Sequence, residues 1–246
     1  MNLVIDRGNT KDKVAVFSNT DMIFCERYDR LSLAALQQLK ERFPMIKNAV
    51  YCSVMKDANA DVLISFLKSE YHFVESEKWK TGINVLYRSK ETLGQDRMAA
   101  MVGANALYHN MNTLVVDCGS CITFDAITAL GDYLGGSISC GLRMKFSALH
   151  NFTANLPLIN VVHFSALIGT TTEESILSGV INGTLEEVEG MIKRYMDKFE
   201  PLNVVLSGGD AEFISKSIKV KHTLETNLVL FGLNNILLNE NKKTNN

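Results

Sequence analysis

The strongest constraint on the fold is a sequence pattern that occurs twice in the chain. Residues 3–17 have the sequence LVIDRGNTKDKVAVF, and residues 114–127 have the sequence LVVDCGSCITFDAI. In both, three apolar residues precede Asp-x-Gly, and a small polar residue and a second β-rich run follow. Apolar runs that flank a glycine turn predict β-hairpins. Asp6 and Asp117 are then equivalent positions of an internal duplication.

Turns of this kind have the chemistry to bind phosphate. Glycine at a bend lets backbone N–H groups approach an anion closely. A carboxylate at the end of a strand, such as Asp6, suits Mg²⁺ when a nucleotide supplies further oxygen ligands. Lys13 begins the return strand and can neutralise charge on a transferred phosphate. An ordinary polar hairpin is the alternative for either turn alone, whereas two such turns and the later Ser-Gly-Gly-Asp at 207–210 favour phosphate binding.

The rest of the chain alternates strand and helix patterns, which predicts an α/β fold with mixed sheets. Apolar positions at helical spacing predict helices over 31–43, 60–69, 96–109, 172–199, 211–218 and 228–238. Further strands are expected over 48–54 and 203–207. Ser32 is the expected N-cap of the first helix, and residues 239–246 are an expected solvated tail. Residues from 143 to about 168 are expected to be irregular, and the polar segment 75–95 lacks a period and is expected to be a functional loop.

Composition excludes several classes of protein. The 246 residues are 46% hydrophobic and 21% charged, with a net charge of −2. Binding to nucleic acid in general needs a basic excess, which is missing here. No run approaches the roughly 20 apolar residues that span a bilayer. The acidic residue at position 6 also interrupts the apolar run that a signal peptide needs. We therefore expect a cytoplasmic protein without nucleic-acid or membrane partners.

The five cysteines include a Cys-Gly-Ser-Cys element at 118–121. A zinc site needs a second pair of ligands, which the sequence lacks. A thioredoxin-type redox pair needs a helix N-terminus, whereas a strand pattern follows here. The signature of papain-like proteases fails at Ile122. We expect these cysteines to be small residues that line a turn.

Six segments together resemble one protein family. They are DRGNTKDK (6–13), LGQDR (93–97), DCGSCITFD (117–125), GDYLGGSISCGL (131–142), IGTTTEESILSGV (168–180) and LSGGDA (206–211). In order and spacing they resemble the type III pantothenate kinases, also called the Bvg accessory factor family, of the actin–hexokinase–Hsp70 superfamily. The resemblance implies two duplicated ribonuclease H-like (actin-like ATPase) lobes, 1–112 and 113–246, with ATP in the cleft. The implied reaction is phosphorylation of pantothenate by ATP, the first step of coenzyme A biosynthesis. Two alternatives stay open: a kinase of the superfamily that acts on another small metabolite, and a non-enzymatic transcriptional accessory factor.

The resemblance also implies roles for individual residues. The implied ATP-binding residues are Asp6, Arg7, Gly8, Asn9, Thr10, Lys11, Asp12, Lys13 and Ser120. The implied pantothenate-binding residues are Tyr87, Gly94, Gln95, Asp96, Arg97 and Thr172. Asp96 is the implied general base, since a carboxylate can take the proton of an attacking hydroxyl, and Asp125 is the reserve candidate. Asp6 is expected to hold Mg²⁺ with ATP, and Asp117 a monovalent cation, K⁺ or NH₄⁺. The Arg97 guanidinium suits the carboxylate of the substrate.

The chain departs from the family pattern at a few positions, and these are Arg7, Lys90, Ser120, Cys140 and Thr170. Arg7 and Thr170 bear on how ATP and substrate are held. The family also implies a homodimer in which Thr172 reaches the neighbouring subunit's pantothenate. We expect the helix that begins near 172 to pair subunits, with Gly179 and Gly183 on the same apolar face as Ile176 and Val180.

Overall fold

The structure is a computed structural model that describes residues 1–53, 58–160 and 166–242. The chain forms two compact units. The first comprises Met1–His109, Gly131–Tyr133 and Asn227–Asn246, and the second comprises Asn110–Leu130 and Leu134–Thr226. The lobes 1–112 and 113–246 stay a prediction. The last helix, which lies within 113–246, groups with the first unit.

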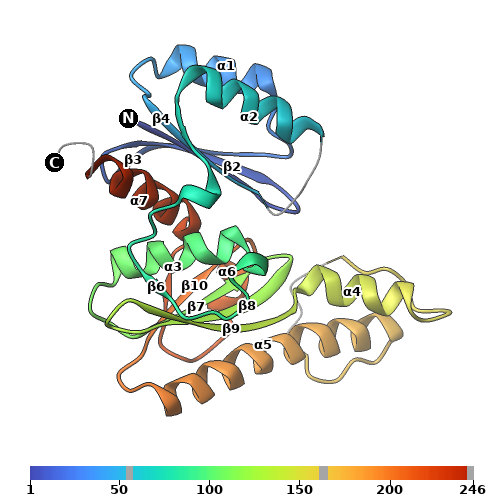
Figure 1. The fold of residues 1–246 in the computed structure, drawn as a ribbon. Helices are drawn as coiled ribbons and strands as arrows, with labels where there is room; N and C mark the ends of the chain where they lie inside the picture. Colours follow the sequence, from blue (N-terminus) through green and yellow to red (C-terminus); the bar gives the residue numbers. More distant parts are fainter. Residues whose placement is uncertain (54–57, 161–165, 243–246) are drawn as a thin grey trace. The chain divides into compact units, whose positions relative to one another are not determined.

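The first unit is built on a mixed five-stranded sheet (Figure 1). Its strands are β1 (Asn2–Arg7), β2 (Asp12–Ser18), β3 (Asp21–Tyr28), β4 (Asn48–Ser53) and β5 (His72–Val74). They lie in the order β3-β2-β1-β4-β5. The pairs β1–β2 and β2–β3 are antiparallel, as the predicted hairpin requires, and β1–β4 and β4–β5 are parallel.

Helices cover both faces of this sheet (Figure 1). On one face lie α1 (Leu33–Arg42) and α2 (Ala58–Glu70), and their apolar residues form a core with those of β1 and β2. Ser32 caps α1 by accepting a hydrogen bond from the Ala35 amide at 3.2 Å, which confirms the expected cap. The other face is covered by α7 (Leu228–Lys242), where Phe231 meets Phe17 edge to face at 5.7 Å.

A second helix pair completes the first unit. Helix α3 (Gln95–Leu107) packs on α7 so closely that the two backbones touch at Gly103 and Gly232. Residues 75–95 before α3 are mostly irregular, as predicted, and contain only short elements: η1 (Ser76–Lys78), β6 (Asn84–Val85) and η2 (Lys90–Thr92).

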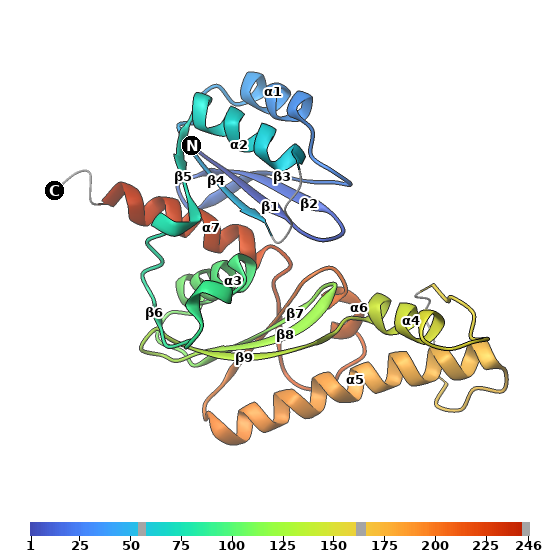
Figure 2. The ribbon, with the colours of Figure 1, turned by 45° about the vertical axis from the view of Figure 1, so that its right-hand side comes forward.

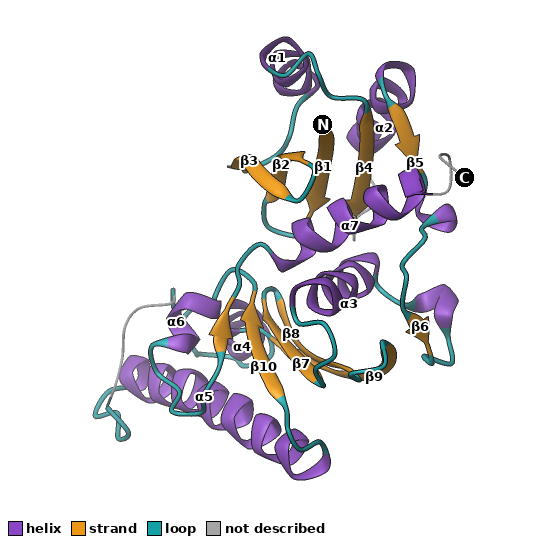
Figure 3. Cartoon of the chain, turned by 90° about the vertical axis from the view of Figure 1, so that its left-hand side faces the viewer, coloured by secondary structure: helices purple, strands orange, loops and turns teal. Residues whose placement is uncertain are grey.

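The second unit repeats the strand order of the first (Figure 3). Its strands are β7 (Thr113–Cys118), β8 (Cys121–Ile127), β9 (Asp132–Cys140), β10 (Asn203–Ser207) and β11 (Thr223–Leu224), in the order β9-β8-β7-β10-β11. Beyond β9 in this sheet lies β6, which pairs with the first residues of β9, themselves grouped with the first unit. The pair β7–β8 is antiparallel, and β7–β10 and β10–β11 are parallel.

The duplication extends to the register of the two predicted turns. Asp6 is the fifth of six residues in β1, and Asp117 is the fifth of six in β7. Asp6 pairs with Lys13 and Cys52, and Asp117 pairs with Thr123 and Ser207. The sequence repeat of the two hairpins is therefore a repeat of whole sheets with flanking helices.

The helices of the second unit differ from the sequence prediction in one place. Helix α5 (Thr172–Lys198) packs on the sheet through Val188 and Ile192, and α6 (Ala211–Ser215) follows β10. The prediction of an irregular stretch from 143 to about 168 was wrong, because α4 (Leu142–Asn151) lies there. Its buried Leu142 and Phe146 are one helical turn apart and share a core with apolar residues of α5. Helix α4 lies beside α5 (Figure 2).

Two more expectations need correction. Gly179 and Gly183 lie on the exposed side of α5, whereas Ile176 and Val180 are buried. Helix α7 continues to Lys242, so the expected solvated tail begins later. Asn239 donates to the Lys80 carbonyl at 3.1 Å and Glu240 pairs with Lys80 at 2.6 Å, which extends the helix.

Parts of three sequence predictions lie outside the described residues: Val54 of the expected strand 48–54, residues 161–165 of the irregular stretch, and residues 243–246 of the tail. Within the described ranges, no helix combines the length and apolarity needed to cross a membrane.

Candidate active site

The first predicted phosphate turn joins β1 to β2. The Gly8 amide donates to the Lys11 carbonyl at 3.2 Å, which closes the turn. A Cβ on Gly8 would lie 3.0 Å from that same oxygen, so the close approach favours glycine. Asn9, Thr10 and Lys11 are exposed at the tip, and Asp6 and Lys13 are half-buried beside each other at the base.

Two of the predicted acidic residues lie near a single thiol. Burial raises the pKa of Cys52 well above its usual value, and the negative charges of Asp6 and Asp96 raise it further. Cys52 pairs with Asp6 across β1 and β4, and Asp96 stands in the first turn of α3. Both carboxylates are half-buried. The fold therefore brings Asp6, Lys13 and Asp96, which are far apart in sequence, to one end of the first sheet.

The start of α3 is shaped around the Asp96 carboxylate. Asp96 Oδ1 accepts the Arg97 amide at 2.8 Å. Gly94 is the N-cap, and a Cβ at that position would lie 2.5 Å from Asp96 Oδ1. Glycine at 94 therefore leaves room for the carboxylate. The Ser53 amide donates to Gln95 Oε1 at 3.4 Å, a long contact between the end of β4 and the start of α3.

Two predicted substrate residues are also brought together. The Arg97 guanidinium lies over the Tyr87 ring, 5.5 Å from its centroid, and Arg97 is only 8% exposed. The Tyr87 ring also stacks on Tyr133, with the two ring centroids 6.3 Å apart. A guanidinium packed on an aromatic face is held in orientation, so Arg97 is preorganised to present its donors to a carboxylate.

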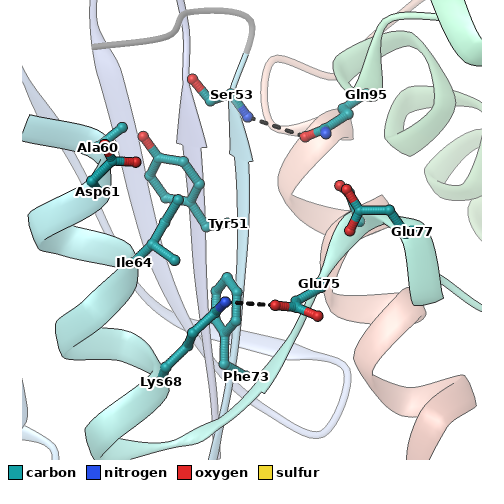
Figure 4. Close-up of a pocket in the computed structure, with 11 residues that line it drawn as sticks. Tyr51, Ser53, Ala60, Asp61, Ile64, Lys68, Phe73, Glu75, Glu77 and Gln95 are labelled. Carbon is teal, nitrogen blue, oxygen red and sulfur yellow. Dashed lines mark hydrogen bonds and ion pairs between the residues drawn. The ribbon is translucent and has the colours of Figure 1, made fainter. Parts of the chain in front are cut away.

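A cavity of about 640 Å³ opens beside this region between α2, β4 and β5 (Figure 4). Tyr51, Ile64 and Phe73 give it apolar walls, and charged residues include Lys68, which is paired with Glu75 at 2.5 Å. Gln95 is the predicted site residue that lines it. Gln95, which directly precedes Asp96 in the sequence, therefore lies at the edge of the cavity.

Two residues predicted to bind ATP have buried side chains. Arg7 is 2% exposed and Asp12 is 0% exposed, and they face each other across β1 and β2 with Arg7 Nη1 3.9 Å from Asp12 Oδ2. Asp12 also accepts the Leu31 amide at 2.7 Å and Arg30 Nη1 at 3.2 Å. The positive charge of Arg7, which departs from the family pattern, is thus compensated by the buried carboxylate of Asp12. Both side chains lie beneath the turn and not on its surface.

The second predicted turn is enclosed by two other backbone segments. The Gly119 amide donates to the Cys121 carbonyl at 3.0 Å, and the Gly141 amide donates to the Ser120 carbonyl at 3.1 Å. Gly208 has φ 95°, and a Cβ there would lie 2.7 Å from Asp117 Oδ1. Only glycine adopts such a conformation without strain. The predicted Gly-Gly turn and Asp117 are therefore adjacent within the second unit.

One acid that the sequence analysis did not assign lies in the same place. Asp210 donates its amide to the Cys118 carbonyl at 2.8 Å. Burial raises the pKa of Asp210, and the nearby Arg143 offsets part of that increase. Burial raises the pKa of Cys118 well above its usual value, and the negative charges of Asp117 and Asp210 raise it further. The position of Asp210 directly after Gly208-Gly209 was the available sequence signal.

The other predicted residues have simpler settings. Thr172 is exposed at the start of α5, where Thr171 caps the helix by accepting the Glu174 amide at 3.1 Å. Thr170, a departure from the family pattern, donates its hydroxyl to Glu174 at 2.6 Å and so helps to hold this helix end. Asp125, the reserve base, is 2% exposed and pairs with Val115 inside the sheet, where a substrate hydroxyl has no access.

The donor types at both turns suit cations that bind with a nucleotide. Among the described residues, no three His, Cys, Asp or Glu side chains come together as a self-sufficient metal site. Mg²⁺ needs no such cluster when phosphates supply ligands, because one or two carboxylates are then enough. The half-exposed carboxylate of Asp6, beside the first glycine turn, fits that requirement, and the half-exposed Asp117 offers a carboxylate to a second cation at the other turn.

Comparisons with known proteins agree with these features. The sequence profile of the family described as "Type III pantothenate kinase" matches residues 2–194. A protein of that name from Christiangramia forsetii is 40% identical over 239 residues, which is 96% of this chain and 98% of the relative.

Solved structures show the same fold at low identity. A Baf family protein from Campylobacter jejuni has a TM-score of 0.58 at 20% identity and covers 98% of this chain and 99% of its own. MreB5 of Spiroplasma citri bound to ADP has a TM-score of 0.50 at 12% identity, with 100% and 98% covered. These likenesses confirm the predicted fold class, the duplicated α/β fold of the actin-like ATPases.

Proposed function

The chain belongs to the type III pantothenate kinase family, and we propose that it phosphorylates the terminal hydroxyl of pantothenate with ATP, the first step of coenzyme A biosynthesis. The observation that carries the proposal is the joint position of Asp6 and Asp96 at the end of β4: Asp6 pairs with Cys52, and the next residue, Ser53, contacts Gln95 at the start of α3. One carboxylate stands at a phosphate turn and the other at the start of a helix next to Arg97. A kinase needs this combination, because the acceptor hydroxyl must be deprotonated beside the phosphate.

In the proposed reaction Asp96 accepts the proton of the attacking hydroxyl. A primary alcohol is a weak nucleophile, and a carboxylate within hydrogen-bond reach removes its proton as the phosphoryl group is transferred. Arg97, held on the Tyr87 ring, binds the pantothenate carboxylate as a fork. Gly94 and Gln95 border the same position. Thr10, Lys11 and the turn amides receive the ATP phosphates, with Lys13 at the base of the turn.

We assign cation binding to the two equivalent aspartates. Mg²⁺ bound with ATP would neutralise the phosphate charge, with Asp6 as its protein ligand. Asp117 would hold a monovalent cation, K⁺ or NH₄⁺, beside Ser120. In support, each aspartate occupies the same register position of its sheet. Replacing K⁺ by Na⁺ or Tris at constant ionic strength should lower turnover, and equal rates would remove the monovalent site.

We further propose a homodimer formed through α5. In support, Gly179 and Gly183 lie exposed, and a Cβ at either position would meet nothing within 4 Å, so this side of the helix is open to a close partner. Exposed Thr172 would then serve the neighbouring subunit's pantothenate. Sedimentation at assay concentration tests the dimer, and Thr172→Ala should raise the pantothenate KM. A fully active monomer would contradict the shared site.

A coupled assay of ADP release with and without pantothenate tests the reaction itself. We expect release that depends on pantothenate, with phosphopantothenate as the product by mass spectrometry. Other small alcohols, such as N-acetylmannosamine and pantetheine, serve as comparison substrates. Faster turnover of another acceptor would assign the chain to a different substrate, and ATP binding without turnover of any acceptor would favour a regulatory protein.

A further inference from the structure

Beneath the first phosphate turn, Arg30 binds the backbone of the turn itself. Arg30 follows β3, and its guanidinium donates to two successive carbonyls. Nη1 lies 3.1 Å from the Gly8 oxygen, and Nη2 lies 2.6 Å from the Asn9 oxygen. The planar fork of arginine presents two donors side by side, so one residue can hold both carbonyls.

The Arg30 guanidinium is anchored from below. Nη1 also donates to Asp12 Oδ1 at 3.2 Å, and Asp12 is fully buried. The other oxygen of Asp12 accepts the Leu31 amide at 2.7 Å, directly after Arg30 in the chain. Arg7 approaches the same carboxylate to 3.9 Å. Arg30 is therefore fixed by a buried acid that is itself fixed by the backbone next to Arg30.

Planarity of the peptide bond determines what this clamp does to the turn. In a trans peptide the N–H points opposite to the carbonyl of the same peptide unit. The Gly8–Asn9 and Asn9–Thr10 peptides are trans. Because Arg30 holds the Gly8 and Asn9 carbonyls on its own side, the Asn9 and Thr10 N–H groups point away from it. Two consecutive amides directed to one side form an anion-binding concavity.

We propose that Arg30 is a positioning residue for the ATP phosphates, which keeps the Asn9 and Thr10 amides directed at them without touching the nucleotide. The inference rests on the proposed use of this turn for ATP. The buried Asp12 then has a role at the site, namely to orient Arg30. Arg30 itself lies after β3, outside every segment that carries the family resemblance.

The test compares binding of ATP and of adenosine by calorimetry in Arg30→Gln, Arg30→Lys and the parent protein. A glutamine is neutral and cannot hold two carbonyls as a fork. We expect Arg30→Gln to weaken ATP binding about tenfold, which corresponds to about 1.4 kcal/mol, and to leave adenosine binding unchanged. Arg30→Lys keeps the positive charge, so its ATP affinity should lie between those of Arg30→Gln and the parent protein. Arg194→Gln, an exposed arginine of α5, is the matched control and should bind ATP like the parent.

The outcomes separate positioning from general support of the fold. Equal losses for ATP and adenosine, or ATP affinity unchanged in Arg30→Gln, would overturn the proposal. If Arg30→Gln does not fold, Arg30→Lys still decides, since parent-like ATP affinity in that variant would exclude a need for the fork. The pantothenate KM should stay constant in Arg30→Lys. A parent protein that binds ATP in an Arg30-dependent way but phosphorylates no pantothenate would refute the proposed reaction and leave this inference standing.

Discussion

The contact between α3 and α7 predicts the effect of a single added methyl group, in the variant Gly232→Ala. A Cβ on Gly232 would overlap the Ala99 carbonyl oxygen and lie 2.6 Å from the Ala99 carbonyl carbon and 2.9 Å from the Gly103 nitrogen. Unstrained carbon contacts are about 3.5–4.0 Å, so the helices must separate by roughly 1–2 Å to relieve all three contacts. The obstructing atoms are backbone, which cannot rotate away as a side chain can.

Two effects of opposite sign then compete. Alanine is favoured over glycine in a helix interior by about 1 kcal/mol. Overpacking against a rigid backbone costs about 1–3 kcal/mol, at the upper end here because the overlap is with main-chain atoms. We expect a net loss of about 2 kcal/mol, which lowers Tm by roughly 4–8 °C for a chain of this size. Since α3 carries Asp96, turnover should fall as well.

Circular dichroism at 222 nm during heating measures the stability change, and Gly190→Ala provides the control. Gly190 lies in α5, and a Cβ there would meet nothing within 4 Å. The same substitution should therefore stabilise the protein by about 0.5–1 kcal/mol through helix propensity alone. If Gly232→Ala unfolds at or above the parent temperature, the backbone contact between α3 and α7 is not present as described.

Three further variants or measurements test other contacts. Asp96→Asn should lower kcat about 10²- to 10⁴-fold and keep its ATP affinity, because only the proposed base is removed; near-normal turnover would assign the base elsewhere. Asp12→Asn leaves the buried Arg7 without its compensating charge and should cost about 3 kcal/mol of stability in urea unfolding, whereas a loss below about 0.5 kcal/mol would show that the pair contributes little. At pH 8, Ellman's reagent should modify exposed Cys140 rapidly and Cys52 only on unfolding, since burial first and then the adjacent carboxylates raise the pKa of the Cys52 thiol; fast modification of Cys52 in the folded protein would contradict its burial.

The sequence predicted the parts of the fold that depend on local pattern. The repeat around Asp6 and Asp117 predicted the duplicated hairpins, and Ser32 predicted a helix start, because turn chemistry and capping involve only nearby residues. Helix α4 was missed because its buried contacts, Leu142 and Phe146, are few and follow a strand without a side-chain cap. The end of α7 was missed because Asn239 and Glu240 find partners at Lys80, which is remote in sequence.

In the candidate site, too, local motifs could be predicted from the sequence, whereas contacts between residues remote in sequence could not. Residues within continuous motifs, such as Asp96 beside Arg97, could be proposed for the site from the sequence, and both lie in the first turn of α3. The burial of Arg7 and Asp12 could not, because each is polar and their pairing depends on the register of β1 and β2. Arg30 carried no sequence signal, since its partners are carbonyl oxygens, which every residue has.

The packing of α7 on β1, β2, β4 and α3 has a consequence for the order in which a ribosome can complete the two units. Residues of the second unit are made before α7, so that unit is complete while the first still lacks one cover of its sheet. Phe231, which packs against Phe17, is synthesised roughly 10–40 s after Phe17 at ~5–20 residues per second. The nascent chain therefore completes last the unit that contains Asp6 and Asp96, the proposed Mg²⁺ ligand and the proposed base.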